Sequence, residues 1–294
     1  MADFAMTVLD IPDIDRGVGL AIVLQTPGGR TWLYDTGTGY PEGDGWQGDV
    51  NSGRDQIEPF LRERGILGLD GIIISHAHYD HFGGLLWLVD RVPIGRLIDN
   101  GYAYGGPRDA HYDKELADYE AIREEFRRRG QYQAVVAGDS LELDEALEVE
   151  VIAPPAEFFE EPHPELRPEK NPGAHYMLNS NSLMLRITHG DVVFLLPGDI
   201  EKEDQSRYLL PSVPEGKLRC DVLVAPGHGL HTADDFVAAT QPKVTVVSLF
   251  ERWLGACSAR EGFASVGSEV YVTGADGDVT VVSDGQGWKV VKGA

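Results

Sequence analysis

Short apolar stretches and amphipathic stretches alternate along the chain. The apolar stretches are rich in Val, Ile and Leu, which favours strands, and they predict strands at residues 4–9, 19–25, 31–34, 72–74, 96–98, 133–137, 140–143, 147–152, 183–187, 192–196, 221–225, 244–248, 269–273, 279–283 and 288–291. Apolar residues recurring three and four positions apart predict helices, at residues 55–64, 85–89, 113–129, 201–210 and 233–239. We place the three strands within 133–152 in a second sheet and the last three in a terminal meander. This order is typical of an α/β sandwich.

Four metal-capable side chains lie within six positions directly after one predicted strand. The strand is Ile72 to Ile74, and the side chains are His76, His78, Asp80 and His81. Zn, Fe and Mn accept imidazole nitrogen and carboxylate oxygen as ligands, and no thiolate is present in this stretch. The first two histidines alternate and would hold one cation, whereas Asp80 and His81 would hold a second. The pattern therefore predicts a paired metal site, and we expect the two glycines that follow to permit a tight turn into the next helix.

The sequence His-Ala-His-Tyr-Asp-His at residues 76–81 resembles the signature of the metallo-β-lactamase superfamily. Three further stretches follow the order of motifs in that family. Residues 33–37 are similar to its strand-ending Asp-x-Gly, residues 194–199 to its Gly-Asp motif, and residues 225–229 to the motif of its last histidine. The resemblance covers nearly the whole chain, and it implies a four-layer αββα sandwich, the metallo-β-lactamase fold.

The same resemblance implies a role for three residues outside the first motif. Asp35 would hold the ligand loop by hydrogen bonds without binding metal. Asp199 would bridge both cations, because a carboxylate has two oxygens, although an Asp that caps a helix is the simpler reading. His228 would join Asp80 and His81 at the second cation. We interpret residues 1–294 as one hydrolase domain, because any cut between Asp35 and His228 would split this site.

The third imidazole of the first cation, which many superfamily members carry, has no counterpart here. The chain offers the polar run Asn179-Ser180-Asn181-Ser182 before the strand at 183–187, with His175 a little earlier. This run resembles the branch of the hydrolase domain of the DNA-uptake protein ComEC and its stand-alone relatives. We favour Asn181 as the ligand that fills the gap, with His175 or a water as the alternatives. We expect two divalent cations, zinc first and manganese or iron as alternatives, and fewer imidazoles shift the preference toward manganese.

The resemblance implies hydrolysis by a metal-bound hydroxide, with phosphodiester bonds as the expected substrate. Asp80 and His231 are the expected catalytic residues, and His231 or a metal-bound water would protonate the leaving group. One alternative is a lactone, carboxylic ester or small phosphoester hydrolase similar to the phosphorylcholine esterases. A second alternative is a metal-stabilised binding module with weak turnover. A loop at 38–53 contains Tyr40 and Trp46, which are candidates for contacts with substrate.

The chain is strongly acidic, with 25 basic and 48 acidic residues and a formal net charge of −23. This charge repels polyanions, so tight binding to duplex nucleic acid is not expected. A pair of divalent cations would reverse the charge locally, so a small-molecule or oligonucleotide phosphoester remains the expected partner. The sequence carries no signal for an oligomeric state.

The N-terminus has no basic segment followed by an apolar core, and no apolar run reaches the roughly 18 residues that span a bilayer. We therefore expect no membrane partner and a cytoplasmic location, although a mature exported protein would show the same pattern. Cys220 and Cys257 are the only cysteines, and Cys220, next to a predicted strand, is expected to be a buried thiol.

Overall fold

The computed structural model describes residues 2–11, 19–40, 50–160 and 173–293. Its first sheet has eight strands in the spatial order β14-β13-β1-β2-β3-β4-β5-β6. Their bounds are β1 (Phe4–Val8), β2 (Ala21–Gln25), β3 (Thr31–Thr36), β4 (Gly71–Ile73), β5 (Leu97–Asp99), β6 (Tyr132–Ala134), β13 (Val279–Ser283) and β14 (Trp288–Lys292). Strands β3 to β6 are parallel to one another, whereas β14, β13, β1, β2 and β3 pair antiparallel.

The second sheet has six strands in the order β12-β11-β10-β9-β8-β7. Their bounds are β7 (Glu148–Ala153), β8 (Met184–His189), β9 (Val192–Leu196), β10 (Val222–Val224), β11 (Val244–Val247) and β12 (Glu269–Val272). Strands β9 to β12 are parallel, and the β7-β8-β9 part is antiparallel. Both sheets thus contain a parallel half, and parallel strands end at one edge, where loops from successive strands meet.

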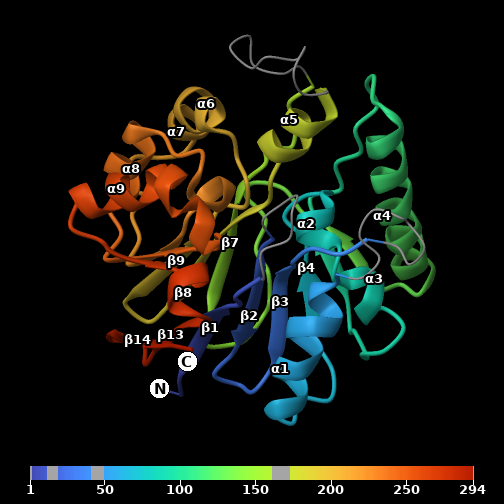
Figure 1. Cartoon of the computed structure of the whole chain (residues 1–294), viewed down its shortest axis with the longest axis horizontal. Helices are drawn as coiled ribbons and strands as arrows, with labels where there is room; N and C mark the ends of the chain where they lie inside the picture. The colour runs from blue at the N-terminus through green and yellow to red at the C-terminus, as the bar shows by residue number, and fades with distance from the viewer. Residues whose placement is uncertain (1, 12–18, 41–49, 161–172, 294) are drawn as a thin grey trace.

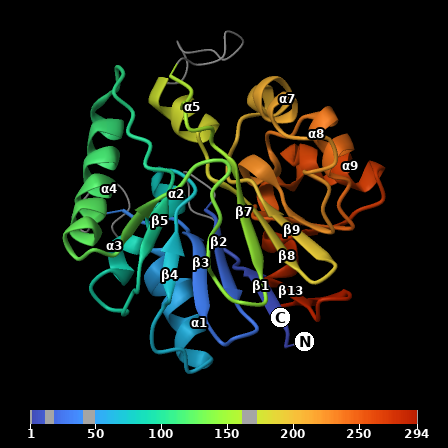
Figure 2. The ribbon, with the colours of Figure 1, turned by 180° about the vertical axis from the view of Figure 1, so that it is seen from behind.

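The two sheets face each other, and helices cover both outer faces (Figures 1 and 2). One apolar core lies between the sheets and includes Phe4, Trp32, Leu185 and Phe194. The outer face of the first sheet packs against η1 (Gly53–Ile57), α1 (Glu58–Glu63), α2 (Tyr79–Phe82), α3 (Leu85–Leu88), α4 (Ala110–Arg128) and α5 (Gly173–Ser180). The outer face of the second sheet packs against η2 (Gln205–Leu209), α7 (Leu210–Ser212), α8 (Asp234–Thr240), η4 (Glu251–Ala256) and α9 (Ser258–Ser265). The remaining short helices are α6 (Lys202–Asp204), η3 (Pro226–Gly229) and α10 (Thr273–Asp276). The predicted αββα sandwich is confirmed.

The assignment of the strands within 133–152 to a second sheet is partly wrong. Strand β6 pairs parallel with β5 at the edge of the first sheet, because α4 between them makes a βαβ crossover. Residues 140–143 form no strand, and Ser140 makes an isolated bridge to Glu150. Leu141 and Leu143 are nevertheless buried in the core between the sheets. The alternation of apolar residues in this segment therefore indicates side-chain burial, although the backbone does not pair as a strand. Strand β7 does belong to the second sheet.

The predicted C-terminal meander is also partly wrong, because only its last two strands pair with each other. Strand β12 pairs parallel with β11 in the second sheet. After α10 the chain crosses to the first sheet, where β13 pairs with β1 and forms a hairpin with β14. Of the last three strands, β12 therefore belongs to the second sheet, and β13 and β14 belong to the first. None of the helices among the described residues has the length and apolar character that crossing a bilayer requires.

Candidate metal centre

The loop after β4 carries the four metal-capable side chains of the first motif. His76 lies in this loop, His78 is the N-cap residue of α2, and Asp80 and His81 lie within the helix. The side chains of the three histidines are buried, and Asp80 is 29% exposed. Because α2 begins shortly after β4 ends, all four side chains lie at the same edge of the first sheet.

The two glycines after this motif form the predicted turn into α3, and they also serve packing. Gly83 has φ −57°, an ordinary helical value. A Cβ on Gly83 would lie 2.1 Å from Gly39 N, and a Cβ on Gly84 would lie 2.0 Å from Thr36 O. Any larger residue would push the ligand-bearing helix away from the end of β3, so both glycines set how closely the two elements approach.

Asp35, at the end of β3, holds the ligand loop in the manner expected from the sequence. Its Oδ1 accepts a hydrogen bond from Ser75 N at 2.7 Å, and its Oδ2 accepts from Ser75 Oγ at 2.7 Å. The Oδ2 atom also lies 2.8 Å from His81 Nδ1. The carboxylate thereby orients the imidazole of His81 so that its Nε2 atom faces Asp199.

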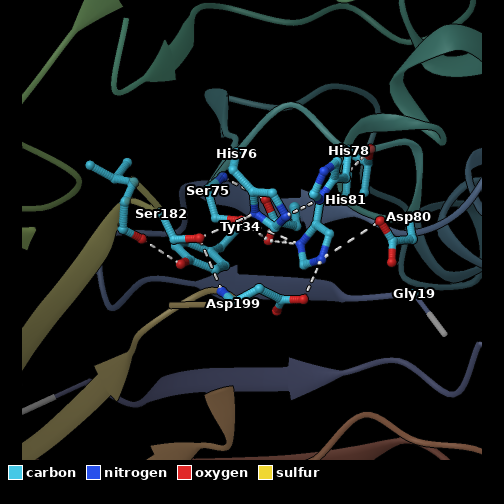
Figure 3. A network of polar contacts seen from close by, with 12 residues as sticks. Gly19, Tyr34, Ser75, His76, His78, Asp80, His81, Ser182 and Asp199 are labelled. Atoms are coloured by element: carbon cyan, nitrogen blue, oxygen red, sulfur yellow. Dashed lines mark hydrogen bonds and ion pairs between the residues drawn. The ribbon is translucent and has the colours of Figure 1, made fainter. Parts of the chain in front are cut away.

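Two overlapping groups of ligand-type atoms meet at this edge of the sheets, and Figure 3 shows His76, Asp80, His81 and Asp199 of these groups. His76, His81 and Asp199 form one group, and Asp80, His81 and His228 form the other, with the ligand atoms of each group within 4.8 Å of one another. The Oδ2 atom of Asp199 lies 3.3 Å from His81 Nε2 and 3.2 Å from His228 Nε2. The oxygens of Asp80 lie 3.9 Å from His81 Nε2 and 3.7 Å from His228 Nε2. Residues from both sheets thus converge on one small volume.

His76 and His78 form a second pairing within this cluster. The Nε2 atom of His76 lies 2.9 Å from Nδ1 of His78, and His76 Nδ1 lies 2.9 Å from Ser75 Oγ. Two nitrogens bound to one zinc lie about 3.3 Å apart, since each is about 2.0 Å from the metal, so one cation would fit both rings. Burial, together with the positive charge of neighbouring imidazoles, holds the pKa of both histidines well below the ordinary value, so both are neutral at pH 7.

His81 and Asp199 carry the charge of the metal-free centre. Burial alone would lower the pKa of His81, but the carboxylates of Asp199, Asp35 and Asp80 raise it well above the ordinary value. Burial likewise acts to raise the pKa of Asp199, but His228 and His81 hold it well below the usual range. A protonated His81 therefore lies between ionised Asp199 and the Asp35 carboxyl, where a cation would compete with its proton.

The last histidine of the site sits on a backbone conformation that few side chains adopt. His228 has φ 52° and lies in η3 between Gly227 and Gly229, which also have positive φ. Its Nδ1 lies 3.2 Å from Ser248 O, and its buried Nε2 makes no hydrogen bond among the described residues. In the described part of the chain Asp35, with φ 57°, is one of two other non-glycine residues with positive φ. Strained backbone of this kind persists where the surroundings enforce it, often at functional sites.

Two residues predicted from the sequence are not among the residues that line the cavity at this cluster. The Asn181 carboxamide accepts a hydrogen bond from Phe159 N at 3.0 Å, and donates to Phe159 O at 3.0 Å and Met177 O at 2.9 Å. These bonds leave it tied to backbone beside β8. His231 is exposed in the loop after η3, and its side chain is not among those that line the cavity at the cluster.

A cavity of about 200 Å³ opens onto the cluster. Its lining consists of Tyr40, His78, Tyr79, Asp80, His111, Tyr112, Glu115, His175, Asn179 and Asp199. The sequence did not single out Glu115, which is buried on α4 with burial raising the pKa of its carboxyl well above the usual value. A charged residue on the apolar face of an amphipathic helix was the signal for it. Trp46 lies outside the described residues.

A larger cavity of about 700 Å³ lies beside Tyr102 and Tyr104. Its lining among the described residues contains one carboxylate, Glu160, and no histidine. Catalytic sites need several convergent polar groups, so the smaller cavity is the chemically competent one.

Three comparisons with known proteins agree with this geometry. The family described as "Metallo-beta-lactamase superfamily" matches residues 14–241. ComE operon protein 3 of Bacillus subtilis (strain 168) is 26% identical over 247 residues, which are 82% of this chain and 28% of that protein. Competence protein ComA of Neisseria gonorrhoeae is 27% identical over 236 residues, which are 80% of this chain and 26% of that protein. The chain thus spans about a quarter of the length of these relatives.

A solved structure of a mutant form of CmlA beta-hydroxylase superposes with a TM-score of 0.50 at 14% sequence identity. It covers 92% of this chain and 52% of that one, and at this identity the likeness concerns the fold alone. The two curated relatives agree with the ComEC-like branch that the motifs resemble. The family match extends over well over half of the sequence, and this chain therefore belongs to the metallo-beta-lactamase superfamily.

Proposed function

We propose that the chain is a metal-dependent hydrolase that uses two divalent cations to cleave phosphodiester bonds. The observation that carries this proposal is the overlap of the two ligand groups, which share His81 and surround Asp199 at the floor of a cavity. Asp199 is grouped with His76 and also lies 3.3 Å from His81 Nε2 and 3.2 Å from His228 Nε2, so its carboxylate reaches imidazoles of both proposed cation sites. A surface cluster formed by chance would not combine buried imidazoles, a buried carboxylate and an open cavity.

The residues fit such cations on the chemistry of their donors. His76, His78 and Asp199 would hold the first cation, and Asp80, His81 and His228 the second, with Asp199 between them. The Nε2 atoms of His81 and His228 are buried and lie 3.3 Å and 3.2 Å from the same Asp199 oxygen, without a well-aligned hydrogen bond among the described residues. Each ring would offer this nitrogen to a cation once His81 has released its proton. Zinc, manganese and iron all accept this set of nitrogen and oxygen donors.

When bound, the cations would supply a water of lowered pKa and electrostatic stabilisation of the attacked phosphorus centre. The chain's own residues do the rest. Asp35 and Ser75 fix the ring of His81, and Asp80, half-buried at the cavity, orients the attacking water by accepting its hydrogen bond. His231 is the proton donor to the leaving group inferred from the sequence, and His175, whose ring stacks 5.1 Å from His78 in the cavity lining, is the second candidate.

The cavity and the charge of the chain favour a small substrate. A volume of about 200 Å³ is less than the roughly 300–1,000 Å³ of pockets that enclose drug-sized ligands, so it suits one phosphate with a small flanking group. The net charge of −23 opposes a long polyanion. The relative from Neisseria is named a competence protein, and a short single-stranded oligonucleotide is the nucleic acid that fits these limits.

A substrate panel tests the proposal. The protein is stripped with a chelator, reloaded with Mn²⁺ or Zn²⁺, and incubated with a bis-aryl phosphodiester, an acyl lactone or a single-stranded oligonucleotide. We expect cleavage of the phosphodiester, with none in chelator. Cleavage of the lactone alone would overturn the proposed substrate class, and two bound cations with no cleavage would identify a binding module.

A further inference from the structure

The polar run of residues 179–182 spans the end of α5 and the start of the connection to β8. Two of its members bond to the segment after β9, one to Asp199 in the loop and one to Asp204 in α6. Ser180 Oγ donates to an Asp204 carboxylate oxygen, and Ser182 Oγ accepts from Asp199 N at 3.1 Å. Since Asn181 is tied to backbone by three hydrogen bonds, Asn179 is the member of the run whose side chain remains to be explained.

The side chain of Asn179 is only 6% exposed, yet half of its carboxamide has no partner. Its Nδ2 donates to Glu201 Oε1 at 2.8 Å, whereas its buried Oδ1 accepts no hydrogen bond among the described residues. A buried acceptor left in this state costs about 1–3 kcal/mol, so a partner outside the protein chain is expected. Asn179 lines the cavity together with His78 and Asp199.

Glu201 fixes which way the carboxamide of Asn179 is turned. Its Oε1 accepts the hydrogen bond from the NH₂ group, and this bond places Oδ1 on the opposite side of the carboxamide. Glu201 is itself buried and lies two residues after Asp199. One loop therefore positions both the expected bridging carboxylate and, through Glu201, the carboxamide beside it.

The first cation site has two imidazoles and one carboxylate, and so lacks a fourth protein donor. We propose that Asn179 Oδ1 is the oxygen donor that completes the site of His76, His78 and Asp199, with Glu201 holding the carboxamide in place. This inference rests on the proposed two-cation function. A neutral oxygen in place of a third imidazole gives a donor set that suits Mn²⁺ and Fe²⁺ as well as Zn²⁺.

Titration of the metal-free protein with Co²⁺ tests this assignment without relying on activity. Bound cations are counted by elemental analysis after gel filtration, and visible absorption of Co²⁺ reports its ligands. We expect two cations per chain in the wild type. Asn179→Ala is expected to weaken one of them by about 10-fold or more, with a changed spectrum, whereas Asn179→Asp keeps an oxygen donor and binds both.

Asn181→Ala is the matched variant, because it removes the same carboxamide two residues away. We expect it to lower the melting temperature, through the loss of its backbone hydrogen bonds, and to retain two cations. Two cations of wild-type affinity in a folded Asn179→Ala protein would overturn the inference, as would loss of a cation in Asn181→Ala alone. A wild type that binds two cations but cleaves no substrate would overturn the proposed hydrolysis and leave the ligand assignment standing, whereas a wild type that binds none would overturn both.

Discussion

Replacing Asp35 by alanine tests whether the site is held from the end of β3. The carboxylate is fully buried and receives three hydrogen-bond donors, which are Ser75 N, Ser75 Oγ and His81 Nδ1, at 2.7 to 2.8 Å. Asp35→Ala leaves all three without their acceptor. The residue also has φ 57°, a conformation that alanine adopts less readily than aspartate.

The expected loss of stability follows from these contacts. Each buried donor left unpaired costs about 1–3 kcal/mol, and breaking a buried ion pair from one side costs about 3–5 kcal/mol. Because the groups share one carboxylate and relax together, we expect the free energy of unfolding to fall by about 3–5 kcal/mol. The freed ring of His81 would also weaken cation binding by about 10- to 100-fold.

Asp144→Ala is the matched control for this experiment. Its carboxylate also receives three donors, from Thr26 Oγ1, Gly28 N and Ala146 N, but it is partly exposed, so water replaces them. We expect about 1 kcal/mol of destabilisation and unchanged cation affinity. The measurements are urea unfolding of the metal-free protein and Co²⁺ titration.

Asp35→Asn provides a milder variant, because asparagine tolerates the left-handed backbone and keeps one accepting oxygen. If Asp35→Ala lost no more stability than Asp144→Ala and bound cations as tightly as the wild type, the reasoning would be refuted.

Four further predictions follow from the site. His78→Ala is expected to abolish cation-dependent cleavage with an unchanged far-ultraviolet circular dichroism spectrum, and retained turnover at full metal content would contradict the assignment. Cation binding at pH 7 is expected to release a proton from His81, whose pKa is raised. Calorimetry in buffers of different ionisation enthalpy should therefore give different apparent binding enthalpies. Identical enthalpies would argue against proton release. The pKa values of His76 and His78 are lowered in the folded state, so their contribution to metal-free stability is present above the unfolded value of about 6.5 and is lost as the pH falls below it. The contribution of His81 is instead lost as the pH rises through its raised pKa. Urea unfolding at several pH values would detect the loss of stability in acid, and its absence would count against buried neutral rings. His175 and His231 are the two candidate proton donors. Replacing the residue that acts by alanine is expected to lower kcat about 100-fold or more and to remove one limb of the pH–rate profile. A pH–rate profile unaffected in both His175→Ala and His231→Ala would leave the role to water.

How far the sequence predicted the site depended on whether the residues are close in the chain. The motif at 76–81 is contiguous, so its ligand types and order were readable without a fold. Asn181 was preferred over Asn179 because the short helix α5, which ends at Ser180, was not predicted. Asn179 lies within α5 and lines the cavity, whereas Asn181 follows the end of the helix and bonds to backbone. Without that helix, the sequence offered no ground for distinguishing the two carboxamides. The sheet membership of β6 and β12 was unreadable for a related reason, since pairing partners lie far away in the chain.

The protonated ring of His81 explains how the metal-free site keeps its geometry. Three carboxyl groups and three other imidazoles surround this ring within a buried cluster, and two of those imidazoles are neutral. The proton on His81 lets Asp199 stay ionised beside it, and the Asp35 hydrogen bond keeps the ring in one orientation. A cation that arrives therefore meets ligands already in position and exchanges for a proton, so little side-chain order has to be created on binding. The same exchange makes cation affinity rise with pH. A site assembled only on binding would show the same pH dependence, but calorimetry would give it a larger entropy loss.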